Sequence, residues 1–110
     1  MQIEELNNYT KLFDIYGKLL SKKQFEVMDK FLNLDLSESE LAELQGESRQ
    51  SVHDAISKAK KQLLGFEQKC GVVKNNEKAK QNLEKSKVFL QNSNENEKAI
   101  ELINETIDTL

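Results

Sequence analysis

The sequence predicts an all-α protein, and three observations support this fold class. The 110-residue chain contains no proline and only four glycines, so few residues interrupt helices. Apolar residues recur at intervals of three and four along most of the chain, which is the spacing of one helix face. No segment alternates apolar and polar residues as a half-buried strand does. We therefore expect helices joined by short turns.

Three helices are predicted before residue 47. The first places five apolar side chains on one face: Leu6, Tyr9, Phe13, Tyr16 and Leu20. The second begins at a capping box, formed by Ser21 and Gln24. Its expected buried side chains are Phe25, Met28, Phe31 and Leu32. The third begins at a second capping box, Ser37 with Glu40, and Gly46 ends it because glycine adopts left-handed conformations readily.

A long helix is predicted between a serine cap at Ser48 and Gly71. Its apolar stripe, which we expect to be buried, is Val52, Ala55, Ile56, Ala59, Leu63, Phe66 and Cys70. A helix of this length extends for roughly 30 Å, which is more than the small bundle before it covers. We therefore expect the half from Lys60 to Lys69 to project and to find another partner.

Residues 72–110 are predicted to form a helical tail, so the expected domains are 1–71 and 72–110. Val72–Asn76 is a candidate joint, and the polar segment Gln91–Asn96 predicts a loop. The tail has two apolar stripes: Ala79, Leu83, Ser86 and Leu90, then Ile100, Ile103, Ile107 and Leu110. Neither helix carries enough apolar surface to be stable alone. We expect the tail to pack on the long helix or on a second subunit.

Composition excludes several classes of protein. Sixteen basic and nineteen acidic residues give a net charge of −3, which excludes a globally basic nucleic-acid binder but leaves a local basic face open. No apolar run approaches the roughly 18 residues of a membrane span, so no membrane insertion is expected. The lone cysteine and the absence of an export signal indicate a reducing, cytoplasmic compartment.

An enzyme is the least favoured class. One histidine and one cysteine do not make a metal site, and no glycine-rich phosphate loop suggests a cofactor. Ser51, His53 and Asp54 do not form a catalytic triad, because adjacent residues of a helix point about 100° apart. We expect no catalytic residue, no metal, no cofactor and no small-molecule substrate.

Leu36–Ala59 has the layout of a helix-turn-helix, with the small Ala42 where the two helices would cross. Val52 and Ile56 define the inward side of the second helix. The candidate contact residues of its cap and its exposed surface are Ser48, Arg49, Gln50, His53, Asp54, Ser57, Lys58 and Lys61. Such side chains contact phosphates or base edges, although Asp54 opposes a phosphate backbone. The alternative is a solvated helix surface without a partner.

Lys22 and Lys23 are a second candidate contact. They lie in the first turn of a predicted helix, where their positive charge opposes the helix dipole. A phosphate or an acidic partner near this turn would relieve that misfit, whereas a tolerated surface pair is the alternative.

Three stretches resemble the YlxM family, small bacterial proteins whose helix-turn-helix is similar to region 4 of sigma factors. They are Tyr16–Gln24, Asp35–Glu43 and Ser48–Ile56, and Phe66–Gly71 resembles the family's end of the long helix. The resemblance covers roughly residues 9–71 and implies a regulatory role in the signal recognition particle pathway. It carries over Ser48, Arg49, Gln50 and Asp54 as a contact surface. Glu47 departs from the family, which has an aliphatic residue there, so Glu47 must be exposed or the turn altered.

The resemblance implies a non-enzymatic accessory protein of protein targeting. We expect the surface of Arg49, Gln50, His53, Lys58 and Lys61 to bind a component of the signal recognition particle pathway, either its RNA or its GTPases. The alternative is a transcription regulator that places the same helix in the major groove of duplex DNA. A third hypothesis is a scaffold protein whose C-terminal helices form a homodimer.

Overall fold

The computed structural model describes residues 2–92 and 96–109, and helices are the only regular elements of these residues. Their bounds are α1 Ile3–Tyr16, η1 Gly17–Leu19 (a 3₁₀ turn), α2 Lys22–Asn33, α3 Glu38–Gln45, α4 Arg49–Cys70, α5 Val72–Gln91 and α6 Asn96–Thr109. The predicted all-α fold class is confirmed. The chain divides into two compact units, Met1–Cys70 (unit 1) and Gly71–Leu110 (unit 2).

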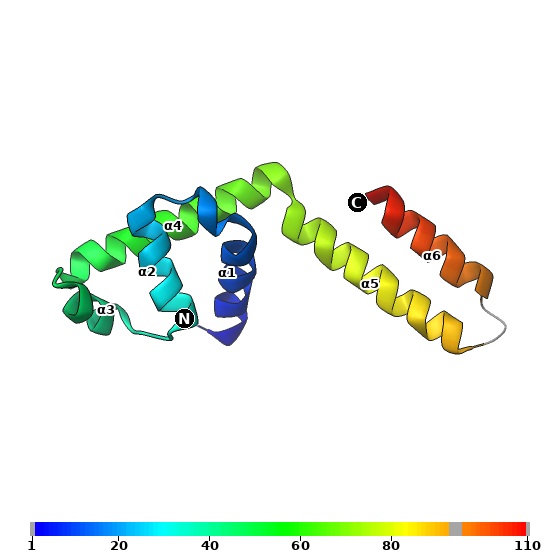
Figure 1. The fold of residues 1–110 in the computed structure, drawn as a ribbon, viewed down its shortest axis with the longest axis horizontal. Helices are drawn as coiled ribbons and strands as arrows, with labels where there is room; N and C mark the ends of the chain where they lie inside the picture. Colours follow the sequence, from blue (N-terminus) through cyan, green and yellow to red (C-terminus); the bar gives the residue numbers. More distant parts are fainter. Residues whose placement is uncertain (1, 93–95, 110) are drawn as a thin grey trace. The chain divides into compact units, whose positions relative to one another are not determined.

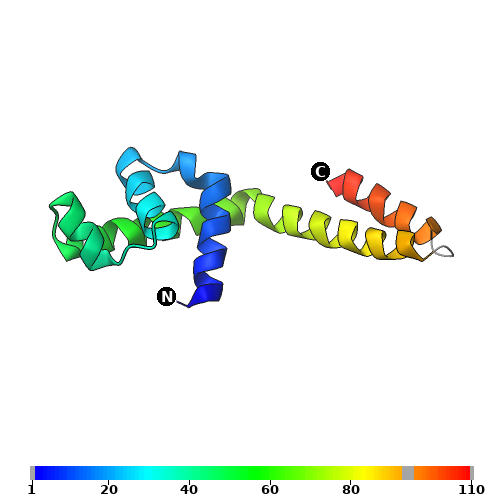
Figure 2. The ribbon, with the colours of Figure 1, turned by 60° about the horizontal axis from the view of Figure 1, so that its bottom comes forward.

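Unit 1 is a bundle in which α4 contacts each of the other three α-helices. Figures 1 and 2 show α3 near the start of α4, α2 beside its middle and α1 across its second half. The largest fully buried side chains are Met28, Leu41, Ile56, Leu63, Val27 and Val52. The predicted inward side of α4 is therefore correct from Val52 to Leu63. Burial of these apolar side chains stabilises the bundle, since each contributes about 1.5–3 kcal/mol.

The predicted helix caps are present. The Gln24 amide donates to Ser21 Oγ at 3.2 Å, and the Glu40 amide donates to Ser37 Oγ at 3.1 Å, each within a complete capping box. The Ser51 amide donates to Ser48 Oγ at 3.0 Å. Gly46 ends α3 with a φ of +66°, as predicted for a glycine C-cap.

Helix α1 packs against the second half of α4, which therefore does not project from the bundle. The Tyr16 hydroxyl donates to Glu67 Oε1 at 2.7 Å, and the Tyr16 ring lies 6.0 Å from that of Phe66. Lys60 Nζ lies 5.0 Å from the centre of the Tyr9 ring. The prediction of a projecting half was therefore wrong. Cys70 is also exposed, contrary to prediction, because the fully buried stripe of α4 ends at Leu63.

The first helix is shorter than its apolar stripe suggests, and the chain tightens into η1 after Tyr16. Gly17 is buried at this change, and a Cβ atom there would lie 3.0 Å from two carbons of the Phe13 ring. Phe13 cannot move away freely because its ring packs on Phe25, with 5.0 Å between their centres. A larger residue here therefore forces the Phe13 ring to shift against Phe25.

We expect Gly17→Ala to lower the free energy of unfolding by about 1–2 kcal/mol through overpacking against Phe13. Urea denaturation followed by tyrosine emission measures the change. Gly65→Ala is the matched control, since nothing lies within 4 Å of a Cβ at that position in α4. This variant gains about 0.5–1 kcal/mol from helix propensity. Equal shifts for the two variants would contradict the steric account.

Unit 2 is a hairpin in which α5 and α6 pack on each other and run antiparallel (Figure 1). α5 begins at Val72, directly after Gly71, which has a φ of +65°. The predicted joint Val72–Asn76 is therefore helical, and Gly71 alone breaks the helix between Cys70 and Val72. The predicted loop starts later, at Asn92, and its residues 93–95 lie outside the described residues.

The two helices of unit 2 meet through small and polar side chains. The buried residues are Ala79, Asn82, Ser86, Ala99 and Thr106. Leu83, Leu90, Ile100 and Ile107 are exposed, so of the predicted stripes only Ala79 and Ser86 are buried in this contact, and the packing of the stripes on the long helix or on a second subunit stays a prediction. The small side chains let the helices approach closely. Leu110 of the second stripe lies outside the described residues. In the described part of the chain, no helix is long and apolar enough to span a membrane.

Candidate nucleic-acid interface

Helices α3 and α4 and the turn between them have the helix-turn-helix layout that the sequence predicts. Ala42 and Val52 are buried, so the two helices share one interior. The Glu47 amide donates to the Ala42 carbonyl at 3.0 Å and so ties the turn to the end of α3. Helix α4 therefore starts at a fixed place relative to α3.

All ten predicted contact residues are exposed. Eight lie at the cap of α4 or within its residues 49–61: Ser48, Arg49, Gln50, His53, Asp54, Ser57, Lys58 and Lys61. The other two, Lys22 and Lys23, form the first turn of α2. We call these ten residues the α2–α4 surface. Their exposure leaves them accessible to a partner, and their role as contacts stays a prediction.

A polar groove of about 290 Å³ joins the start of α2 to α4. Its lining residues are Ser21, Lys23, Gln24, Ser51, Asp54, Ala55 and Lys58. The structure thus brings Lys23 beside Asp54 and Lys58, although more than 30 residues separate Lys23 from Lys58 in the sequence. The two lysines flank one continuous surface.

Several side chains of the α2–α4 surface already contact carboxylates of the protein itself. Gln50 Nε2 donates to Asp54 Oδ1 at 2.9 Å, within one turn of α4. His53 Nδ1 lies 3.1 Å from Glu38 Oε1, at the start of α3. These contacts orient the Gln50 amide and the His53 ring before any partner arrives. A nucleic acid that uses either side chain must compete with a carboxylate of the protein itself.

Four cations of this surface remain without such a partner among the described residues, Lys22 on α2 and three on α4. Arg49, Lys58 and Lys61 form no ion pair with any residue that the structure describes. All three lie between residues 49 and 61 of α4 and are exposed. They are the groups of this surface most available to a phosphate, because no internal carboxylate has to be displaced.

Glu47 is partly exposed and paired. Its carboxylate accepts from Ser51 Oγ at 3.2 Å and lies 3.1 Å from Lys23 Nζ. The Glu47 side chain retains 29% of its accessible surface, so its charge remains partly hydrated. The first of the two expected outcomes therefore holds: Glu47 reaches solvent, and the turn keeps its regular geometry.

Glu38 and Glu47 were not predicted as partners of the α2–α4 surface. Glu47 lies four residues before Ser51, a spacing at which helical side chains meet, so this contact had a local signal. Glu38 lies fifteen residues before His53, and their contact depends on how α3 crosses α4. No local pattern reveals that crossing.

The side chains named for a triad point to different partners. Ser51 Oγ donates to Glu47, whereas His53 lies against Glu38. Among the described residues, no group of three or more His, Cys, Asp or Glu is placed to hold a metal ion. The chemistry that this surface supports is ionic contact and hydrogen bonding.

Comparisons with known proteins extend over both units. The model of the UPF0122 family, described as "Putative helix-turn-helix protein, YlxM / p13 like", matches residues 3–104. A UPF0122 protein of Clostridium acetobutylicum is 35% identical over 106 residues, which are 94% of this chain and 91% of the relative. A UPF0122 protein of Thermoanaerobacter sp. is 36% identical over 94 residues, or 86% of this chain and 80% of the relative. The similarity therefore continues into the tail, and the chain belongs to the UPF0122 family of YlxM / p13-like helix-turn-helix proteins.

Proposed function

We propose that the protein is a non-enzymatic accessory protein of the signal recognition particle pathway that binds the particle's RNA through the α2–α4 surface. The helix-turn-helix family implies nucleic-acid binding. The resemblance to YlxM proteins directs the proposal to the targeting pathway. The observation that carries it is the exposure of Arg49, Lys58 and Lys61 on one helix without internal carboxylate partners.

The charge of the surface determines the kind of binding. Arg49, Lys58 and Lys61, with Lys22 nearby in α2, offer a small number of phosphate contacts. The net charge of −3 gives no long-range attraction to a polyanion. Binding then depends on the local contacts, and its affinity is moderate and sensitive to salt.

Duplex DNA is the second candidate ligand. The exposed start of α4 in a helix-turn-helix favours it, because such helices place their first turns in the major groove. Asp54 counts against it, since its carboxylate lies on the outward side of α4 and holds the Gln50 amide. RNA with unpaired loops requires less complementarity to a groove and is the preferred ligand.

Fluorescence anisotropy with the full chain tests the proposal. The probes are labelled particle RNA, an unrelated RNA of equal length and a duplex DNA, each at several salt concentrations. We expect the particle RNA to bind at least about tenfold more tightly than the duplex, with log K falling against log salt with a slope of about −2 to −3. Tighter binding of the duplex would instead support the transcription regulator.

The targeting GTPases provide the remaining comparison. Their binding to the full chain is measured in the same buffer without RNA. If the full chain binds none of the nucleic acids but binds a GTPase, the partner of the α2–α4 surface is an acidic protein surface and not RNA. Absence of all binding at physiological salt would refute the proposal.

A further inference from the structure

One side of the α5–α6 hairpin is apolar and uncovered within unit 2. Its residues, which we call the apolar face, are Leu83, Leu90, Ile100, Ile103 and Ile107. Leu83, Leu90, Ile100 and Ile107 are between 52% and 62% exposed, and Ile103 is half-buried. An uncovered row of large aliphatic side chains on both helices of a hairpin indicates an interaction surface.

Helix geometry places these residues on the same side. On α5, Leu83 and Leu90 lie roughly 45–70° to one side of the buried stripe of Ala79, Asn82 and Ser86. The isoleucines of α6 are displaced from the buried stripe of α6 in the same direction of rotation about the helix axis, viewed from the N-terminus of each helix. Because the helices are antiparallel, equal senses of rotation lead to the same side of the hairpin. Lys78 and Glu105, turned the other way on each helix, pair at 3.9 Å on the opposite side.

The interior of the hairpin is too poor to stabilise it alone. The buried residues are two alanines and three polar side chains, and Asn82 Nδ2 has no hydrogen-bond partner among the described residues. Units of about 40 residues usually need a metal, disulfides or association to fold stably. The large aliphatic side chains lie on the apolar face, so covering that face would supply most of the missing apolar burial.

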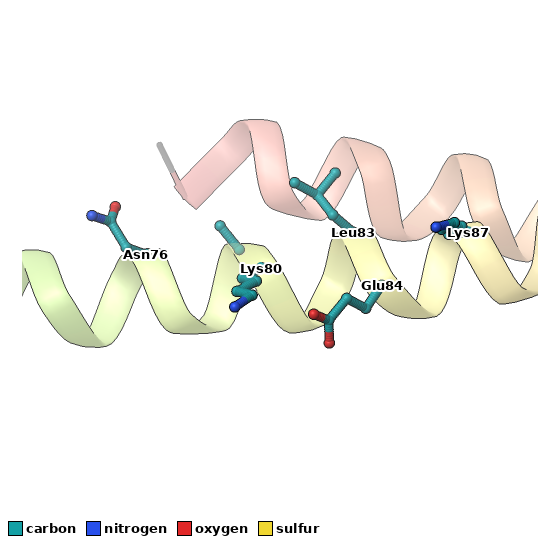
Figure 3. Close-up of a pocket in the computed structure, with 6 residues that line it drawn as sticks. Asn76, Lys80, Leu83, Glu84 and Lys87 are labelled. Carbon is teal, nitrogen blue, oxygen red and sulfur yellow. The ribbon is translucent and has the colours of Figure 1, made fainter. Parts of the chain in front are cut away.

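Charged residues at the edges of the apolar face indicate what covers it. Along α5 its outer edge carries Lys80, Glu84 and Lys87, and Figure 3 shows Leu83 projecting between the two lysines. Along α6 the outer edge carries Glu97 and Asp108. The α5 edge is net basic, with two lysines and one glutamate, and the α6 edge is acidic. A second copy of the hairpin offers the complementary edges, provided that α5 of one copy lies over α6 of the other.

The register of the hairpin brings these charges to matching heights. Ser86 Oγ lies 3.4 Å from the Ala99 carbonyl, so Lys87 is level with the start of α6 and with Glu97. The pair of Lys78 and Glu105 places Lys80 within about one and a half helical turns of Asp108. A twofold axis parallel to the helices preserves these heights and sets each lysine opposite a carboxylate. A perpendicular axis would set lysine against lysine.

We propose that the apolar face binds the same face of a second copy, so that two hairpins form an antiparallel four-helix bundle. The twofold axis lies parallel to the helices, with α5 over the partner's α6. The contact buries the aliphatic side chains of both copies, and Lys80 and Lys87 border it opposite acidic residues. The dimer carries two α2–α4 surfaces, but its formation does not depend on what they bind.

Sedimentation equilibrium of the full chain, from about 1 to 200 μM, tests association directly. The wild type is expected to form a dimer within this range. Leu83→Lys weakens the dimer at least about tenfold, since every substitution occurs twice in a symmetric dimer. Val88→Lys is the matched control, because Val88 is 63% exposed but lies on the other side of α5. A wild type that stays monomeric throughout, or equal effects of the two variants, would overturn the proposal.

Charge reversal tests the arrangement independently of hairpin stability. The variant with Lys80→Glu and Lys87→Glu repels itself, and so does the variant with Glu97→Lys and Asp108→Lys. An equimolar mixture of the two restores complementary edges and is expected to dimerise about as well as the wild type. Lys85→Glu, on the opposite side of α5, is the control for a change of charge alone. Failure of the mixture to recover association would rule out the proposed arrangement.

Discussion

Leu63→Ala is expected to lower the free energy of unfolding of unit 1 by about 3 kcal/mol, whereas Leu64→Ala changes it by about 0.5 kcal/mol or less. The two leucines are adjacent in α4, and the substitution is the same. Leu63 is fully buried, while Leu64 is 51% exposed. Truncation of Leu63 leaves a cavity in the bundle, whereas truncation of Leu64 removes atoms that water already reaches.

Tyrosine emission makes this comparison specific to unit 1. The chain has no tryptophan, and both tyrosines, Tyr9 and Tyr16, lie in α1. A unit of this size is stable by only about 4–10 kcal/mol, so a loss of 3 kcal/mol shifts the urea midpoint clearly. Equal midpoints for the two variants would show that α4 does not pack as described.

Local signals predicted the helix-turn-helix accurately. Each serine cap forms a hydrogen bond within three residues, and the apolar spacing of α4 depends on one helix alone. Such features need no knowledge of the rest of the fold. The exposure of the candidate contact residues could be predicted in the same way, because the exposed side of a helix follows once its buried side is known.

Contacts between distant segments were not predictable in this way. Tyr16 and Glu67 are 51 residues apart, and neither residue shows in sequence that α1 covers the end of α4. Periodicity identifies an apolar side but does not identify the element that covers it. The projecting half of α4 was therefore predicted wrongly, although its stripe was correct as far as Leu63.

The contact between the two helices of unit 2 was also not predictable from apolar spacing. The helices of unit 2 meet through Ala79, Ser86 and Ala99, whereas their most apolar residues stay exposed. The apolar spacing of the tail identifies an apolar side of each helix but does not show that these two helices pack on each other. Small side chains let two helices approach closely, and this leaves Leu83 and Ile107 for another partner.

The variant with Arg49→Ala and Lys61→Ala is expected to bind nucleic acid about a hundredfold more weakly than the wild type near 0.1 M salt. Each residue offers a charged phosphate contact worth about 1.5 kcal/mol, and neither has an internal ion pair among the described residues to lose. The fold should be unaffected, since both side chains are exposed. Anisotropy with the tightest-binding probe, at several salt concentrations, measures the loss.

The salt dependence separates lost phosphate contacts from a general loss of structure. Two missing contacts reduce the slope of log K against log salt by about 1.5–2, whereas partial unfolding lowers the affinity with little change in slope. Lys69→Ala with Lys85→Ala removes the same charge from outside the α2–α4 surface, and this control is expected to bind within about twofold of the wild type. If the control loses as much affinity as the double variant, binding follows overall charge and no recognition surface exists on α4.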